Sequence, residues 1–471
     1  MRAAEPVEGR VLTKRNARES NRIQTQSWGN TMSGLAGVRE KAIKDKQQKF
    51  TSLMHHVTPS LLYQSFYQLK RQSAKGIDGV SWKDYQENLA DRLQELHARI
   101  HSGRYKPKPA RRVYIPKAGG EQRPLSIQCL EDKLVQQATV TVLNQIYEVD
   151  FKGFSYGFRP ECSQHDALDA LTYGLTKRKV NWVLDLDIRR FFDTVEHDWL
   201  IRMIQHRVKD KRLIALITRW IKVGVVEEGN GRVPTSSGLP QGAVISPLLS
   251  NIYLHYVFDL WSQQWRRRNA KGEVLIVRYA DDAVLCFQNK WDANEYLILL
   301  HQRLSKFGLA IHSEKTRLIR FGRFAAEQCA NKGLGRPQTF DFLGFTHYCT
   351  TRQNGDFKVG RKTMKKRLVS QIKAVQEELR RRMHDSVGLT LKWVRSVITG
   401  HMNYYSVPGN SRSIQAFHGE IVKRWLKMLR RRSQRHVINW SRFGPWVRRW
   451  LPKVRIVHPY PEMRFRAKYS K

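Results

Sequence analysis

The chain has 471 residues, enough to bury large hydrophobic cores in two to four domains. Its 84 Lys and Arg outnumber 41 Asp and Glu, which gives a formal net charge of +43. This excess is too large to serve solubility alone, and it predicts that the partner is a polyanion, nucleic acid.

The cysteines and the apolar runs argue against several other classes of protein. The five cysteines include no C-x-x-C pair, which argues against zinc ribbons and cysteine-paired nuclease modules. The N-terminus lacks the apolar core of a signal peptide, and no run of 18 apolar residues occurs. We therefore expect a protein of the bacterial cytoplasm and nucleoid, without a membrane partner.

The first part of the chain predicts helices around a basic hairpin. Residues 1–50 are polar and basic with weak periodicity, so we expect a poorly ordered extension there. Helical spacing follows over 53–98, interrupted by the turn KGIDGVSW. The segments RRVYIPK (111–117) and RPLSIQ (123–128) predict two strands, and 130–147 predicts a buried helix.

Two strand-like segments further along carry carboxylates. The segment VNWVLDLDIRRFF (180–192) predicts a strand that leads into a helix or turn. The segment IVRYADDAVLCF (276–287) predicts a hairpin with Asp281 and Asp282 at its tip. Two like charges in such an apolar setting indicate either a solvated turn or a site for divalent metal.

The composition changes near residue 355. Amphipathic helices are predicted over 362–384, 389–405 and 413–435. Residues 361–471 hold 28 Lys and Arg against 5 Asp and Glu, interleaved with Trp and Tyr. Such surfaces bind phosphates and stack on bases. The predicted fold class is α+β, a mixed body followed by a basic helical domain.

Asp185 and Asp187 share one face of the first strand, because side chains two residues apart point the same way. For either carboxylate alone, a structural salt bridge is the ordinary interpretation. The presence of Asp281 and Asp282 weakens the salt-bridge interpretation, because carboxylates from a strand end and a hairpin tip can converge. Mg²⁺ prefers such carboxylate oxygens as ligands. Two Mg²⁺ ions, or Mn²⁺ in their place, would activate a 3′-hydroxyl and stabilise a leaving pyrophosphate.

Cations that suit a triphosphate occur in the hairpin and beyond it. Arg123 and Lys117 lie on its two arms, where a basic solvated hairpin is the alternative interpretation. Gln241, in PQG, places a side-chain amide beside a helix. Lys315, in SEKT, is either a surface lysine or a general acid for the leaving group.

Together these segments resemble the group II intron-encoded reverse transcriptases and maturases. The resemblance covers about residues 52–450 and rests on ordered blocks: KGIDGVSW, YIPKAGGEQRPLSI, SYGFRP, VLDLDIRRFFDTVEHDWL, SGLPQGAVISPLLSNIYLHYVFD, VRYADDAVL, EKTRLIRFG and DFLGF. It implies a right-hand polymerase fold, in which fingers and a palm with an antiparallel sheet precede a basic α-helical thumb and maturase domain.

The resemblance implies that Asp187, Asp281 and Asp282 form the metal-binding triad, with Lys315 approaching from the following motif. Asp187 is preferred to Asp185 because it directly precedes the residues IRRFFD. The implied cofactor is a pair of Mg²⁺ ions.

The resemblance also implies a nucleotide pocket. Lys117 and Arg123 would hold the triphosphate, and Gln241 would line the pocket. Phe192 would pack under the sugar and disfavour ribonucleotides, with the neighbouring Phe191 as the rival for this role.

Four regions are implied. Residues 1–50 would be the extension, 51–355 the fingers and palm with a template-covering part at 51–100, 356–440 the thumb and maturase domain, and 441–471 a basic DNA-binding-like tail. The implied partners are an RNA template, a DNA or RNA primer, dNTPs, structured group II intron RNA and target DNA.

The chain departs from the family pattern in three respects. Ala243 stands in PQGA where PQGG is common, a small change that we expect to be tolerated. No paired-cysteine endonuclease precedes Lys471, so we expect the endonuclease-lacking type, without DNA nicking in cis. The first 50 residues match no family block.

Three other functions compete with an intron-mobility reverse transcriptase. The chain could be a non-catalytic RNA-binding maturase, although the intact carboxylates argue against this. It could equally be an intron-derived polymerase used by the host in DNA repair or phage defence, which the sequence does not separate from a mobile-element role. An RNA-dependent RNA polymerase is disfavoured by the bulky Phe192. The oligomeric state stays open.

Overall fold

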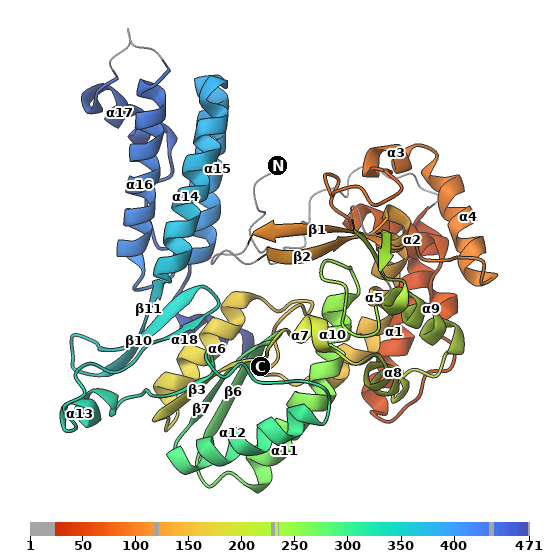
Figure 1. The fold of residues 1–471 in the computed structure, drawn as a ribbon, viewed down its shortest axis with the longest axis horizontal. Coiled ribbons are helices and arrows are strands. Elements are labelled where there is room, and N and C mark those ends of the chain that lie inside the picture. Colours follow the sequence, from red (N-terminus) through yellow and green to blue (C-terminus); the bar gives the residue numbers. More distant parts are fainter. Residues whose placement is uncertain (1–23, 117–121, 228–230, 234, 433–437, 470–471) are drawn as a thin grey trace.

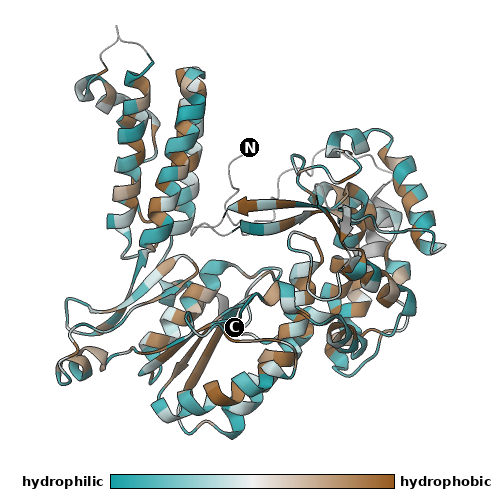
Figure 2. Cartoon of the chain, viewed as in Figure 1, coloured by the Kyte–Doolittle hydropathy of each residue, from teal (hydrophilic) through white to brown (hydrophobic). Residues whose placement is uncertain are grey.

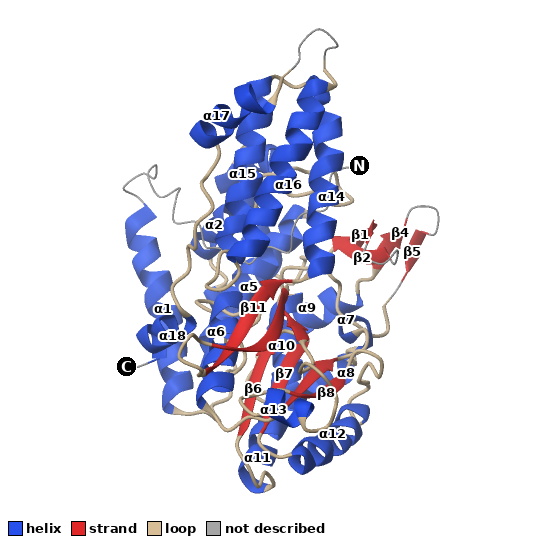
Figure 3. Cartoon of the chain, turned by 90° about the vertical axis from the view of Figure 1, so that its left-hand side faces the viewer, coloured by secondary structure: helices blue, strands red, loops and turns tan. Residues whose placement is uncertain are grey.

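The computed structural model of the chain describes residues 24–116, 122–227, 231–233, 235–432 and 438–469. Figure 1 shows a helical part built from the first half of the chain, a central sheet with helices on both sides, and a group of long helices that stands away from both. Figure 3 shows the central strands with helices around them, and the small sheet of β1, β2, β4 and β5 at the right-hand edge. The fold is thus mixed, with helices and antiparallel sheets, as the predicted fold class requires.

The N-terminal helical part is organised around α5 (Leu130–Asp150), which is buried along most of its length. The helices that surround it are α1 (Gln24–Lys44), α2 (Pro59–Gln68), α3 (Trp82–Gln86), α4 (Leu89–His101), α8 (His197–Gln205) and α9 (Lys211–Lys222). A small sheet in the order β2-β1-β4-β5 extends from this part, formed by β1 (Ala110–Pro116), β2 (Gln122–Ile127), β4 (Val225–Glu227) and β5 (Gly231–Val233). The strands β1 and β2 form the predicted hairpin.

Helix α1 differs from the poorly ordered extension predicted for residues 1–50. Residues 24–44 are helical, and Leu35, Val38 and Ala42 are buried at helical spacing in the same core as α5. The prediction was wrong for this segment because a stripe of three apolar side chains is too sparse to stand out, whereas tertiary packing stabilises it.

The central sheet has the order β6-β7-β3-β8 and is antiparallel. Its strands are β3 (Trp182–Asp187), β6 (Val274–Tyr279), β7 (Asp282–Phe287) and β8 (Arg317–Arg320). Leu184 and Leu186 pack on the face covered by α11 (Leu260–Arg268) and α12 (Lys290–Ser305). Val183 packs on the opposite face with α6 (Gln164–Lys177). Asp185 and Asp187, in phase with Val183, belong to this second face.

Shorter elements precede α11 along the chain. They are α7 (Phe191–Thr194), α10 (Ser246–Leu254) and a π-helical turn (His255–Asp259) between α10 and α11. Single-turn 3₁₀ helices cover Met54–His56 and Arg382–His384.

The C-terminal part contains a second small sheet and the long helices. Strands β9 (Phe340–Phe342), β10 (Phe345–Thr351) and β11 (Phe357–Thr363) have the order β11-β10-β9, and α13 (Ala325–Ala330) precedes them. The helices are α14 (Lys365–Arg381), α15 (Val387–Tyr405), α16 (Ser411–Arg430), α17 (Trp440–Trp450) and α18 (Pro461–Tyr469). Teal and brown alternate along α14–α16 in Figure 2, as expected for amphipathic helices, and α18 returns to pack on α6.

Within the described residues, no helix is both long and apolar enough to span a bilayer. The five cysteines are all free, as expected for a chain without a disulfide framework.

Candidate active site

Two strand ends bring the three predicted carboxylates together. Strand β3 ends at Asp187 and β7 begins at Asp282, and these residues pair directly in the antiparallel register. Asp281 directly precedes Asp282, in the two-residue turn that joins β6 to β7. In this turn Ala280 has a φ of 57°, a conformation that costs energy for any residue with a β-carbon. The predicted hairpin tip is therefore a strained turn that presents carboxylates at one end of the sheet.

Lys315 joins this group. Its Nζ lies 3.1 Å from Oδ2 of Asp187. The segment around it is fixed by the backbone, because the His312 N–H donates to the Asp187 carbonyl oxygen over 2.9 Å. Asp185 has a different cation, Arg317, at 3.5 Å. The structure thus gives the two carboxylates of β3 separate partners.

The carboxylates at the turn have raised pKa values. Burial raises the pKa of Asp281, and the charge of Asp187 adds to this effect. Although part of the Asp282 side chain remains exposed, burial of its carboxyl raises the pKa to about 7, with further contributions from Asp281 and Asp187. The charge of Arg123 lowers the pKa of Asp281 and so opposes this shift. The charge of Arg367, on α14, does the same for Asp282. Crowded carboxylates with raised pKa values indicate a site that lacks positive charge.

The donor set suits a hard cation such as Mg²⁺, which prefers carboxylate oxygens. In the part of the chain that the structure describes, however, no three His, Cys, Asp or Glu side chains are close enough together to hold a metal ion. Lys315 supplies the positive charge nearest to Asp187. Lys315 is therefore the cation that any metal ion at Asp187 would lie beside.

A buried arginine below the turn was not predicted as a site residue. Arg278 donates to both carboxylate oxygens of Asp259, over 2.7 and 2.6 Å, and to Oδ1 of Asn251 over 3.1 Å. It also donates to the Ala280 carbonyl oxygen over 2.9 Å and to the Ser155 hydroxyl over 2.7 Å. A single side chain thereby fixes the turn that carries Asp281. The available signal was an arginine inside an apolar strand, in VRYADD.

Two of the predicted nucleotide-binding residues contact each other. Nε of Arg123 donates to Oε1 of Gln241 over 3.0 Å, and Nε2 of Gln241 donates to Asp193 over 3.2 Å. The Ser126 N–H donates to the Gln241 carbonyl oxygen over 2.7 Å, which holds the PQG loop against β2. Lys117 lies outside the described residues.

The two candidate gate residues differ in burial. Phe191 is 2% exposed and packs in the core, whereas Phe192 is partly exposed, with its ring edge-on at 5.4 Å from that of Phe191. A residue that contacts a substrate has to be accessible. Of the two rings, Phe192 is the accessible one.

Comparison with known proteins identifies the class of this domain. Residues 115–347 match the family described as reverse transcriptase (RNA-dependent DNA polymerase). These residues include β2, β3, β6–β8 and the carboxylate turn. This part of the chain is therefore similar to a reverse transcriptase domain.

Individual proteins similar to this chain indicate which kind of reverse transcriptase it resembles. Protein YkfC of Escherichia coli (strain K12) is 42% identical over 238 residues, which cover 45% of this chain and 62% of that protein. The group II intron-encoded protein LtrA of Lactococcus lactis subsp. cremoris is 35% identical over 233 residues, 48% of this chain and 37% of LtrA. The putative COX1/OXI3 intron 2 protein of Saccharomyces cerevisiae is 30% identical over 250 residues, 52% of this chain and 29% of that protein.

The family match and these relatives support a group II intron reverse transcriptase or maturase. The matched region spans less than two thirds of the length of these relatives.

Proposed function

We propose that the chain is an RNA-directed DNA polymerase of the group II intron type. The observation that carries this proposal is the direct register pairing of Asp187 with Asp282, with Asp281 in the adjoining turn and Lys315 beside them. In this proposal the central sheet is the palm, the N-terminal helical part and the β1–β2 hairpin are the fingers, and α14–α16 are the thumb.

The three carboxylates would hold two Mg²⁺ ions, which when bound supply positive charge to the triphosphate and the primer terminus. In the transfer, the primer 3′-hydroxyl loses its proton to solvent water, its oxygen bonds to the α-phosphorus, and the bond from the α-phosphorus to pyrophosphate breaks. Arg123 binds the triphosphate, and Gln241 orients Arg123 through their hydrogen bond. Lys315 gives a proton to the leaving pyrophosphate. Phe192 packs under the deoxyribose and excludes a 2′-hydroxyl.

We also propose that the chain binds its intron RNA and so assists splicing and mobility. The long basic helices of the C-terminal part support this, since Lys and Arg crowd the exposed faces of α14 and α16. A non-catalytic RNA-binding maturase is the second candidate. It is favoured by the basic faces of α14 and α16, which would bind RNA whether or not the carboxylates hold metal.

Primer extension on an RNA template with dNTPs and Mg²⁺ tests the polymerase proposal. We expect Asp187→Asn and Asp281→Asn each to reduce DNA synthesis by about a hundred- to a thousand-fold, because single electrostatic groups at a reacting centre contribute about 10²–10³ in rate. Binding of the RNA template should be largely unchanged, since only metal ligation is lost.

Asp185→Asn is the matched control, because it makes the same change on the same strand face two residues away. It should retain most of the activity. Equal losses in Asp185→Asn and Asp187→Asn would show that the carboxylates act structurally. Tight RNA binding without synthesis by the unmodified chain would favour the non-catalytic maturase.

A further inference from the structure

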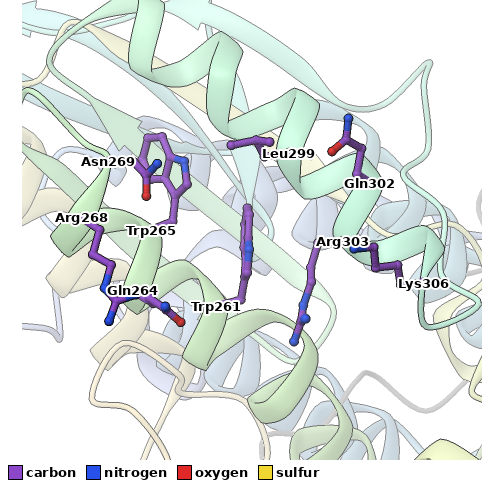
Figure 4. Close-up of a pocket in the computed structure, with 9 residues that line it drawn as sticks. All are labelled: Trp261, Gln264, Trp265, Arg268, Asn269, Leu299, Gln302, Arg303 and Lys306. Carbon is purple, nitrogen blue, oxygen red and sulfur yellow. The ribbon is translucent and has the colours of Figure 1, made fainter.

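A groove of about 400 Å³ lies between α11 and α12. Figure 4 shows the two helices facing each other, with Trp261 of α11 and Arg303 of α12 in the space between them. Trp265 and Arg268 of α11 also line the groove, as does Lys306, the residue after the end of α12. Aromatic rings thus form the inside of the groove, and cations stand around it.

This groove is separate from the carboxylate site. Helices α11 and α12 cover the sheet face of Leu184 and Leu186, whereas Asp187 is in phase with the opposite face. A ligand bound here would therefore contact neither the carboxylate turn nor a template held against it.

The side chains of the groove are arranged for a ligand that is both flat and anionic. Trp261 is only partly buried, with its ring 5.2 Å from that of Tyr296. Trp265 is 3% exposed, and its indole N–H is buried without an acceptor among the described residues, so this ring forms the floor of the groove by packing. Arg268 and Lys306 are exposed and make no ion pair within the described part of the chain.

Arg303 completes the site as a fixed cation. Its guanidinium donates to the carbonyl oxygens of Val257 and Tyr256, each over 3.1 Å, and lies 4.5 Å from the centre of the Phe307 ring. It therefore shapes the wall, while Arg268 and Lys306 remain available to an anion.

We propose that the groove between α11 and α12 binds an unpaired nucleotide of an RNA, with the base beside Trp261 and the flanking phosphates at Arg268 and Lys306. Stacking on an indole with a cation at the backbone is the usual way in which proteins hold single-stranded nucleic acid. The proposal rests on the RNA-binding part of the proposed function and assigns it a second contact, outside the catalytic site.

The test uses the full chain with its catalytic site saturated by an unlabelled RNA–DNA template–primer. The probe is fluorescently labelled oligo(A) RNA of roughly ten nucleotides, within the length that one single-strand-binding surface covers. We expect Arg268→Glu and Lys306→Glu each to weaken binding of this probe by about ten-fold. The slope of log K against log[salt] should fall by roughly 0.7, the value for one phosphate contact to a single strand.

Arg267→Glu is the matched control, since it reverses the same charge on the next residue of α11 without lining the groove. Trp261→Leu tests the stacking surface. It should weaken the binding of oligo(A) RNA without altering DNA synthesis on a short template. An equal loss of probe binding in Arg267→Glu and Arg268→Glu would overturn the proposal, because only general surface charge would be at work.

Two further outcomes would also overturn it. Labelled ATP that binds as tightly as the oligonucleotide and depends on Arg268 would assign the groove to a free nucleotide. A change of oligomeric state in Arg268→Glu, with probe binding intact, would assign it to protein contacts. Groove-dependent probe binding by a chain that makes no DNA would uphold this proposal and refute only the polymerase proposal.

Discussion

At the scale of single residues, Asp185 and Asp187 show how position on a strand decides what a carboxylate does. They share one face of β3, yet Asp185 pairs with Arg317 and Asp187 with Lys315. Asp187 also lies opposite Asp282 in the register, at the strained turn, whereas Asp185 lies opposite Val284. Only the outer of the two carboxylates therefore pairs directly with another acidic residue in the sheet, and this difference supports its proposed role as the metal ligand of β3.

Phe192 and Phe191 provide a matched pair for sugar discrimination. We expect Phe192→Ala to raise incorporation of ribonucleotides, because the partly exposed ring is lost from the proposed position under the sugar. Phe191→Ala removes a buried ring and should lower the free energy of unfolding by about 3–5 kcal/mol. Single-nucleotide incorporation of dNTP against rNTP, together with thermal melting, separates the two. Unchanged sugar selectivity in Phe192→Ala would place the gate elsewhere.

The raised pKa of Asp282 predicts that the stability of the metal-free chain depends on pH. This pKa is raised in the folded state, to about 7, so the folded state binds this proton more tightly than the unfolded state does. Stability from this group is therefore lost as pH rises from about 4, the ordinary pKa of an Asp, to about 7. We expect the melting temperature of Asp282→Asn to fall less than that of the unmodified chain between pH 5 and pH 8.

Added Mg²⁺ should raise the melting temperature of the unmodified chain more at pH 8 than at pH 5, because the ionised carboxylates bind the ion. Asp91→Asn, at an exposed position of α4, serves as the control and should leave the pH dependence unchanged. A parallel pH response in Asp282→Asn and the unmodified chain would contradict the assignment.

At the scale of elements, the β6–β7 hairpin depends on the side chain beneath it. Arg278 is 1% exposed and neutralises Asp259, which is fully buried in the π-helical turn between α10 and α11. We expect Arg278→Met to lower the free energy of unfolding by about 3–5 kcal/mol, because it leaves a buried carboxylate without its cation. Chemical denaturation measures this.

The double variant Arg278→Met with Asp259→Leu should recover much of that loss, because no unpaired charge remains. DNA synthesis should nevertheless stay low, since the carbonyl oxygen of Ala280 still lacks its donor. Full activity in a stable double variant would mean that Arg278 serves stability alone.

The sequence predicted these elements better than their contacts. Alternation of apolar residues predicted β1, β2, β3 and the β6–β7 hairpin, because strand faces repeat every two residues. The partners of Arg278 were not predictable from pattern. Asp259 lies 19 residues away and Ser155 lies 123 residues away, on elements that only the fold brings together. The effect of Arg367 on the pKa of Asp282 was not predictable for the same reason, because Arg367 lies on α14.

At the scale of the whole molecule, the C-terminal segment links the long helices to the central sheet. The Val457 and His458 N–H groups both donate to the Ser406 carbonyl oxygen at the end of α15, over 3.1 Å. Beyond them α18 packs on α6, where Phe465 stacks on Tyr173 with ring centres 4.7 Å apart. The group of long helices is therefore joined to the sheet by the chain that enters it at α14 and by the chain that leaves it.

Asp169 on α6 is the centre of this second connection. It is 1% exposed and contacts two arginines, Arg361 of β11 at 3.3 Å and Arg464 of α18. We expect Arg464→Ala to speed amide hydrogen exchange in α18 by about ten-fold or more, since a hydrogen bond to a charged group contributes roughly 1.5–3 kcal/mol. The global fold should persist, because Arg361 still neutralises the carboxylate.

Asp169→Ala should have a different effect, because it leaves the 2% exposed Arg361 buried without a counter-ion. We expect it to lower the free energy of unfolding of the whole chain by about 3–5 kcal/mol. Lys177→Ala, which removes only the half-exposed pair with Glu462, should cost less than about 1 kcal/mol. If exchange in α18 were equally fast in Arg464→Ala and Lys177→Ala, the buried pair would not be what holds this segment. If it were fast only in the former, one arginine would couple the long helices to the sheet that carries the carboxylates.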